Sequence, residues 1–166
     1  MVSESLTFSI AIHTVTSMSP QLKSGIYTIT NKSSGQLIGR NVLENKMFGP
    51  KGIFSQPLEK AGENTEWVIK ATDEKYRLEV QGAPAIVQDK RVYADITGKS
   101  TVEEWDIVAQ FHAGENTYII TNAASGEGWT LEDKETQIAC HDIVARFSDP
   151  PGFAPNQLWV IVPVAE

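Results

Sequence analysis

The chain has 166 residues, of which 41% are hydrophobic and 21% are charged, and its formal net charge is −7. These values describe a soluble globular chain that is long enough for one domain with a core of its own. The acidic balance argues against a nucleic-acid-binding protein, which needs a basic face, and no apolar run approaches the roughly 20 residues that span a bilayer.

The cysteine content and the N-terminal residues indicate the cellular compartment in which the protein is expected. Cys140 is the only cysteine, so no intramolecular disulfide can form and a reducing compartment is favoured. The first residues have no basic segment before their apolar run, which is untypical of a signal peptide, so we expect a cytoplasmic protein. Residues 1–18 are interpreted as an N-terminal extension, loosely held or adding residues 6–12 as an edge strand, ahead of a domain of residues 19–166.

The first part of this domain reads as strand, turn and strand. Residues 26–30 are rich in β-forming side chains, and residues 31–35 form a turn that ends in a glycine. Residues 36–39 then return as a second strand. A weaker strand pattern at residues 52–55 and a tail that contains Trp67 complete this part.

The same order of elements recurs twice more along the chain. In the second part the strand patterns are residues 76–80, 85–87, 91–94 and the tail with Trp105. In the third part they are residues 118–122, 128–131, 143–147 and the tail with Trp159. The string Ile-Thr-Asn-x-x-Ser-Gly occurs at residues 29–35 and again at residues 120–126. A repeat of this kind constrains the fold more strongly than any single motif.

Three repeats of four short strands predict an all-β protein with the β-trefoil fold. In this fold six of the twelve strands form a barrel and the other six form three hairpins that cap one end. The three pseudo-repeats are expected at about residues 24–71, 72–109 and 110–166. Each contains a tyrosine near its start and a tryptophan near its end, and we expect these aromatic residues to be equivalent layers of one core.

The repeats differ most after their second strands. In the first repeat the link of residues 40–51 is long and carries three basic side chains, Arg40, Lys46 and Lys51. The corresponding link in the second repeat is only about residues 88–90, and the one in the third repeat is acidic. Loops on a rigid scaffold often carry function, so residues 40–51 are the first candidate for a functional site.

A second departure from the repeat is the segment of residues 147–156, which contains three prolines and one glycine. Prolines fix the backbone and make such a segment stiff. We expect it to lie as a rigid cover over the bottom of the barrel.

Patterns that carry catalytic or cofactor chemistry are missing from the sequence. It has no zinc spacing, P-loop, dinucleotide-binding glycine motif or nucleophile elbow. Cys140 and His141 are adjacent, so on a strand they point to opposite faces and make a poor nucleophile–base pair. We expect a buried or half-buried thiol there. Neither an enzyme nor a bound cofactor or metal is expected.

Three segments carry a resemblance to a known family: Ser-Gly-x-Tyr-x-Ile-x-Asn at residues 24–31, Gly39-Arg40-Asn41, and Asn156-Gln157-Leu158-Trp159. They resemble the mushroom β-trefoil serine protease inhibitors of the cospin and cnispin type. The mycocypins, which inhibit cysteine proteases, are more distant relatives in fold. The resemblance covers about residues 19–166.

The resemblance implies an inhibitor of trypsin-like serine proteases that acts through the link between its second and third strands. Separately from the resemblance, we expect a monomer. Arg40 is the position that matches the inserted basic residue, followed by Asn41 and Val42, and Lys46 and Lys51 are alternatives. The pocket of a trypsin-like protease ends in a carboxylate, with which an arginine forms a bidentate, charge-assisted pair. The expected partner is therefore a protease, and neither a nucleic acid nor a membrane.

Other inhibitory specificities stay open at this stage. Asn41 could be read by an asparagine-specific protease instead of Arg40 being read by a trypsin-like one. Cysteine proteases could be bound through other trefoil loops, for which the turns at residues 31–35 and 81–83 are candidates.

A carbohydrate-binding lectin of the ricin-B type is the main alternative to an inhibitor. Gln157-Leu158-Trp159 fits the Gln-x-Trp signature of such lectins, whereas the other two Trp tails do not. Their sugar sites also need an aspartate beside a stacking aromatic ring. Two pairs could supply these groups: Asp89 with Tyr93, and Asp133 with Trp129. We expect instead that the Trp tails belong to the core and that Gln157 makes framework hydrogen bonds.

Overall fold

The computed structural model describes residues 21–165, and most of its regular structure is β-strand. The strands are β1 (Gly25–Asn31), β2 (Leu37–Arg40), β3 (Lys51–Gln56), β4 (Trp67–Thr72), β5 (Lys75–Val80), β6 (Ala83–Gln88), β7 (Arg91–Ala94), β8 (Trp105–Ala109), β9 (Thr117–Asn122), β10 (Gly128–Thr130), β11 (Ala139–His141) and β12 (Trp159–Pro163). The 3-10 helices are η1 (Leu58–Lys60), η2 (Glu63–Thr65), η3 (Phe111–Ala113) and η4 (Pro155–Gln157). The extension at residues 1–18, with its expected edge strand, lies outside the described residues.

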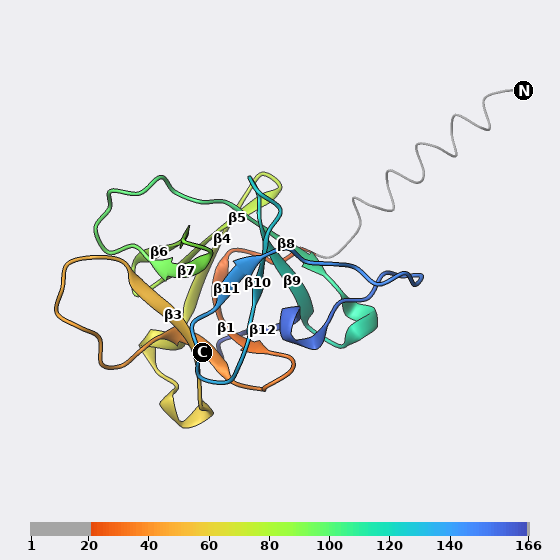
Figure 1. The fold of residues 1–166 in the computed structure, drawn as a ribbon, viewed down its shortest axis with the longest axis horizontal. Coiled ribbons are helices and arrows are strands. Elements are labelled where there is room, and N and C mark those ends of the chain that lie inside the picture. Colours follow the sequence, from red (N-terminus) through yellow and green to blue (C-terminus); the bar gives the residue numbers. More distant parts are fainter. Residues whose placement is uncertain (1–20, 166) are drawn as a thin grey trace, which may run out of the picture.

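Six strands close into a barrel, as the repeat predicted (Figure 1). The antiparallel pairs β1–β4, β4–β5, β5–β8, β8–β9, β9–β12 and β12–β1 run round it without a gap. The hairpins β2–β3, β6–β7 and β10–β11 contact one another through the pairs β3–β7 and β7–β11. The chain is therefore an all-β protein with the β-trefoil fold. None of the helices between residues 21 and 165 is long and apolar enough to cross a membrane.

The tyrosine and tryptophan that mark each repeat lie directly opposite each other on neighbouring barrel strands. The pairs are Tyr27 with Trp67, Tyr76 with Trp105, and Tyr118 with Trp159. All six side chains are buried. Cross-strand aromatic pairs of this kind stabilise a sheet and fix its register, which explains why the pattern recurs once per repeat.

A fourth tryptophan, Trp129 in β10, joins these three pairs into one cluster. Its ring centroid lies 5.6 Å from that of Trp67, 5.8 Å from that of Trp105 and 5.8 Å from that of Trp159. The rings meet edge to face or tilted, which is the favoured arrangement of aromatic pairs. All four side chains have an exposed fraction of 0%. The Trp tails are therefore core, as the sequence indicated.

The third strand of the third repeat lies earlier in the chain than predicted. The prediction placed it at residues 143–147, but β11 covers Ala139–His141, and the prediction was wrong. Ile138, Ala139 and Cys140 are completely buried, whereas Val144 and Phe147 have exposed fractions of 75% and 109%. The apolar residues after β11 alternate as in a strand, but their side chains do not pack against the core.

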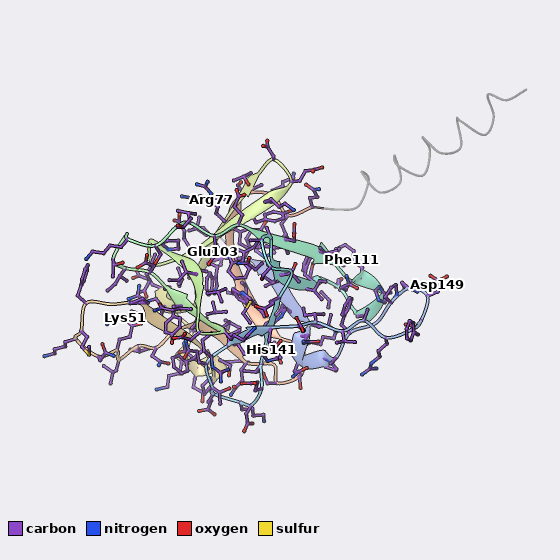
Figure 2. All side chains as sticks on the ribbon, turned by 45° about the horizontal axis from the view of Figure 1, so that its top comes forward. Lys51, Arg77, Glu103, Phe111, His141 and Asp149 are labelled. Carbon is purple, nitrogen blue, oxygen red and sulfur yellow. The ribbon has the colours of Figure 1, made fainter. Side chains whose placement is uncertain are left out.

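The proline-containing segment also differs from its prediction. It extends away from the barrel at the end of the molecule opposite to the β2–β3 link, with Asp149 near its tip (Figures 1 and 2). Phe147 is fully exposed, and the segment is held at its base by a hydrogen bond from the Arg146 amide to the Gly152 carbonyl oxygen (2.8 Å). It is therefore a projecting loop, and the interpretation as a rigid cover was wrong.

Replacing Trp129, Trp67, Trp105 or Trp159 by alanine is expected to lower the free energy of unfolding by about 3–5 kcal/mol, because burial is lost and a cavity remains. Urea or thermal denaturation of the single variants measures this loss. Phe147→Ala is the matched control, since an exposed aromatic side chain is expected to change stability by no more than about 0.5 kcal/mol. Equal, small losses at the tryptophans and at Phe147 would contradict the role of the cluster.

Candidate functional site

Residues 41–50, hereafter loop 41–50, connect β2 to β3 and contain no strand or helix. The loop extends sideways from the cap of the barrel (orange in Figure 1). Lys51 at its end pairs with Ala94, the last residue of β7. The link of residues 95–104 consequently leaves the cap beside it (green in Figure 1).

The first peptide of the loop is anchored to the barrel by two amide side chains. Gln56 Nε2 and Asn64 Nδ2 each donate to the Arg40 carbonyl oxygen at 2.7 Å. Gly39 makes this possible, because a Cβ atom there would lie 2.0 Å from the Asn64 carbonyl oxygen. Only a glycine lets the backbone of η2 pack so closely on β2, and the close packing brings Asn64 to the start of the loop.

Arg40 braces the first arc of the loop, residues 40–44. Its Nε donates to Glu44 Oε2 at 3.0 Å and its Nη2 to Glu44 Oε1 at 2.8 Å. The exposed fractions of the two side chains are only 13% and 20%. This bidentate pair closes the arc and holds Asn41, Val42 and Leu43 on its outer side, because a fork-to-fork ion pair fixes geometry as well as distance.

Lys51 braces the second arc of the loop, residues 45–51. Its Nζ donates to the Asn45 carbonyl oxygen (2.9 Å), to Asn45 Oδ1 (3.0 Å) and to the Met47 carbonyl oxygen (2.6 Å). An ammonium group has three N–H donors, and all three are used. Lys51 is consequently buried, at 7% exposed, and lies at the base of the loop in Figure 2.

The carbonyl oxygens held by Lys51 belong to the residues on either side of Lys46. The Lys46 side chain is exposed, and no ion pair involves it among residues 21–165. One lysine of this arc is thus a structural brace and the other is presented to solvent.

Large apolar side chains make up much of the outer surface of loop 41–50. The exposed fractions are 64% for Val42, 89% for Leu43, 75% for Met47 and 71% for Phe48. Hollows flank the first arc, and Asn41 lines three of them. The arc therefore stands up as a ridge, a shape that fits into the cleft of a partner.

The five residues that the sequence suggested for the site divide into two groups. Asn41, Val42 and Lys46 are exposed, whereas the side chains of Arg40 and Lys51 point inward and brace the loop. Sequence reasoning overlooked Leu43, Met47 and Phe48, although three large apolar residues in a link without strand periodicity were a signal. The alternative that Lys51 enters a partner is contradicted by its burial and its three hydrogen bonds.

The neighbouring link of residues 95–104 is ordered by Asp95. Its carboxylate accepts hydrogen bonds from the hydroxyl and amide of Thr97 and from the amide of Ser100. These hydrogen bonds hold the pKa of the buried Asp95 carboxyl below its usual value, and the bond from the Thr97 hydroxyl has the largest effect. Both links on this side of the barrel thus have fixed shapes.

One of the two residue pairs suggested for a sugar site is excluded by the structure. Trp129 is completely buried, so the proposed pairing with Asp133 is wrong. Gln157 Nε2 donates to Thr130 Oγ1 (3.1 Å) and to the Asp142 carbonyl oxygen (3.2 Å), which confirms its framework role. Tyr93 lines a hollow beneath loop 41–50, and Asp89 is not part of that lining.

Cys140 is buried inside the cap, and His141 is partly exposed on the other face of β11. Burial, together with the nearby Glu127 and Glu103 carboxylates, raises the pKa of the Cys140 thiol to about 12. The thiolate is the reactive form of cysteine, so this residue has no nucleophilic role near neutral pH.

A family model described as peptidase inhibitor I66 matches residues 18–163. A curated serine protease inhibitor from Lentinula edodes is 31% identical over 143 residues, which cover 85% of this chain and 97% of that protein. The solved structure of a proteinase inhibitor from Coprinopsis cinerea superposes with a TM-score of 0.82 at 28% identity and covers 87% of this chain and 100% of its own.

Lectins with the same fold are also similar in structure. The Macrolepiota procera ricin B-like lectin, solved in complex with lactose, matches with a TM-score of 0.63 at 20% identity and covers 87% of this chain and all of its own. An identity this low shows a common fold alone, and function has to be argued from the site.

In the native protein Cys140 is expected to react with a thiol reagent such as DTNB only slowly at pH 8, because the thiol is buried and stays protonated. Reaction in urea is the positive control, and the number of thiols titrated there is expected to be one per chain. Fast, complete reaction of the native protein would contradict this placement of Cys140.

Lys51→Met is expected to loosen the second arc while leaving the barrel folded, since the freed acceptors lie on exposed residues and regain water. Cleavage within loop 41–50 by a protease of broad specificity should become about tenfold faster or more, which corresponds to a loss of about 1.4 kcal/mol of bracing. Mass spectrometry of the fragments locates the cut. Lys32→Met, at an exposed lysine of another turn, is the matched control, and an unchanged cleavage rate in Lys51→Met would argue against the brace.

Proposed function

Because this chain belongs to the peptidase inhibitor I66 family, a family of protease inhibitors and not of enzymes, we propose that it inhibits a trypsin-like serine protease through loop 41–50. The observation that carries the proposal is the arrangement around Lys46. Its side chain is exposed, while Lys51 holds the backbone carbonyl oxygens of both neighbouring residues. A basic side chain presented from a fixed backbone suits a pocket that ends in a carboxylate.

The bracing of the loop explains how it can inhibit a protease without being degraded. A loop that is already held in its bound shape loses little conformational entropy on binding, so it binds tightly and is released slowly. If the peptide bond after Lys46 is cut, Lys51 still contacts Asn45 on one side and Met47 on the other. The two new chain ends then stay together, which favours re-formation of the bond over release.

Arg40, which the sequence favoured as the inserted residue, stays a second candidate for the same role. Its guanidinium can enter an acidic pocket only by exchanging the Glu44 carboxylate for that of the protease. This exchange replaces one ion pair by another. Its free-energy cost is small, because partly exposed ion pairs contribute little to stability. Its carbonyl oxygen, however, is turned toward Gln56 and Asn64 and away from a partner.

Loop 41–50 and the neighbouring link together can supply the surface area that a protease complex buries. Such complexes bury about 800 Å² on each partner, which is more than one arc can supply. The ordered link of residues 95–104 leaves the same side of the barrel and can supply the remainder (Figure 1).

Lys46→Ala is expected to weaken inhibition of trypsin by about 30-fold or more, the effect of removing the anchor of an interface. Inhibition constants measured by titration of trypsin activity test this, with Lys32→Ala as the matched control at an exposed lysine away from the loop. Equal inhibition by Lys46→Ala and the wild-type protein would contradict the proposal that Lys46 is the residue inserted into the protease pocket.

Glu44→Gln distinguishes a bracing Arg40 from an inserted one. If Arg40 is a brace, loss of its ion pair loosens the first arc and weakens inhibition, as Arg40→Ala does. If Arg40 is the inserted residue, the freed guanidinium binds trypsin more tightly in Glu44→Gln, whereas Arg40→Ala abolishes inhibition. We expect the first result. Absence of inhibition of any serine protease by the wild-type protein would reject the proposed function as a whole.

A further inference from the structure

Met47 places a thioether on the outer surface of loop 41–50. Its side chain has an exposed fraction of 75%, and it is the only methionine among residues 21–165. Methionine is most often a buried residue, whose flexible side chain fills gaps in a core. A thioether at the surface is instead within reach of oxidants that are dissolved in the solvent.

Burial protects the other readily oxidised sulfur and indole groups of residues 21–165. Cys140 and the four tryptophans all have an exposed fraction of 0%. The raised pKa of Cys140 also keeps its thiol protonated near neutral pH, whereas oxidants attack the thiolate. Among these groups Met47 is therefore the one that a dissolved oxidant reaches in the folded protein.

The backbone of Met47 is fixed, so its side chain has a defined place beside Lys46. The Met47 amide donates to Asn45 Oδ1 at 3.0 Å, and the Met47 carbonyl oxygen accepts from Lys51 Nζ at 2.6 Å. The peptide bond that a protease attacks after Lys46 is the bond to Met47. A protease that takes Lys46 into its pocket therefore also covers the Met47 side chain, because the residues next to an anchor lie at the centre of an interface.

We propose that Met47 is an oxidation site at which a hydroperoxide converts the thioether to a sulfoxide and thereby weakens binding of the protease. The inference rests on the proposed function, in which Lys46 enters the protease, and it adds regulation of the same site. The sulfur lone pair attacks the terminal peroxide oxygen, the O–O bond breaks and an S–O bond forms. The hydroxyl proton passes to the departing oxygen, which leaves as water or an alcohol. Sulfur is oxidised by two electrons and the peroxide is reduced by two.

The sulfoxide is expected to change binding and not folding. Its oxygen is a hydrogen-bond acceptor on a side chain that was apolar before. In the free protein this oxygen is hydrated, because Met47 is exposed. In the complex the protease removes this water, and a polar group that is buried without a partner weakens the interface. Methionine sulfoxide reductases reverse the oxidation: a dithiol supplies two electrons and the oxygen leaves as water, so the change acts as a switch.

The test treats the full chain with dilute hydrogen peroxide and compares each protein with itself before and after treatment. Peptide mass spectrometry is expected to find one added oxygen atom on Met47. Titration of trypsin activity is expected to give an inhibition constant that is higher by about tenfold or more. Methionine sulfoxide reductase with a dithiol is expected to restore the original constant, and the urea midpoint of unfolding is expected to stay the same throughout.

Two variants show whether Met47 is the responsible residue. The inhibition constant of Met47→Leu is expected not to change on treatment, although Met1 and Met18 are still present in this variant. The double variant Met47→Leu/Val144→Met moves the thioether to a different loop, at a position that has the same exposed fraction of 75%. Its inhibition constant is likewise expected not to change.

Each other outcome contradicts the inference. A Met47 sulfoxide that leaves the inhibition constant unchanged, or a Met47 that peroxide does not oxidise in the native protein, would overturn it and leave the proposed function intact. An equal loss of inhibition in either treated variant would place the sensitive residue elsewhere and overturn it as well. Absence of trypsin inhibition by the untreated wild-type protein would overturn both the inference and the proposed function.

Discussion

The contact of Trp129 with three other tryptophans is the interaction on which the rest of the structure depends. Trp67, Trp105 and Trp159 each begin the last strand of a repeat, and Trp129 is in contact with all three. Two indole N–H groups add fixed hydrogen bonds, from Trp67 to the Ile38 carbonyl oxygen (2.9 Å) and from Trp159 to the Trp129 carbonyl oxygen (3.2 Å). Barrel and cap are thereby tied together without a disulfide.

The rigidity of this core reaches the surface through a short chain of contacts. Ile38 and Gly39 in β2 lie beside the cluster and beside η2, and η2 delivers Asn64 to the first peptide of loop 41–50. At the other end of the loop, Lys51 is already part of β3. Both braces of the loop are therefore attached to barrel-cap strands, and the loop has the fixed shape that tight binding of a protease requires.

The same scaffold is compatible with different functions, as the similarity to both inhibitors and lectins shows. The features that separate them here lie outside the shared strands. Gln157 and Trp129 are used internally, whereas loop 41–50 exposes four large apolar side chains. This is the usual division in a superfold, where strands supply position and links supply chemistry.

The sequence by itself determined the trefoil, the burial of the repeated tyrosines and tryptophans in one core and the location of the unusual link, because strand periodicity and an internal repeat are local signals that the core must satisfy three times. The sequence pattern placed β11 at residues 143–147, because these residues alternate like a strand. Only the pairing of Cys140 with Trp129 in the folded protein shows that the strand is Ala139–His141. The sequence also could not tell which basic residues of loop 41–50 point outward. The tertiary structure decided this, because a Glu44 carboxylate beside Arg40 and carbonyl oxygens around Lys51 exist only once the loop is folded.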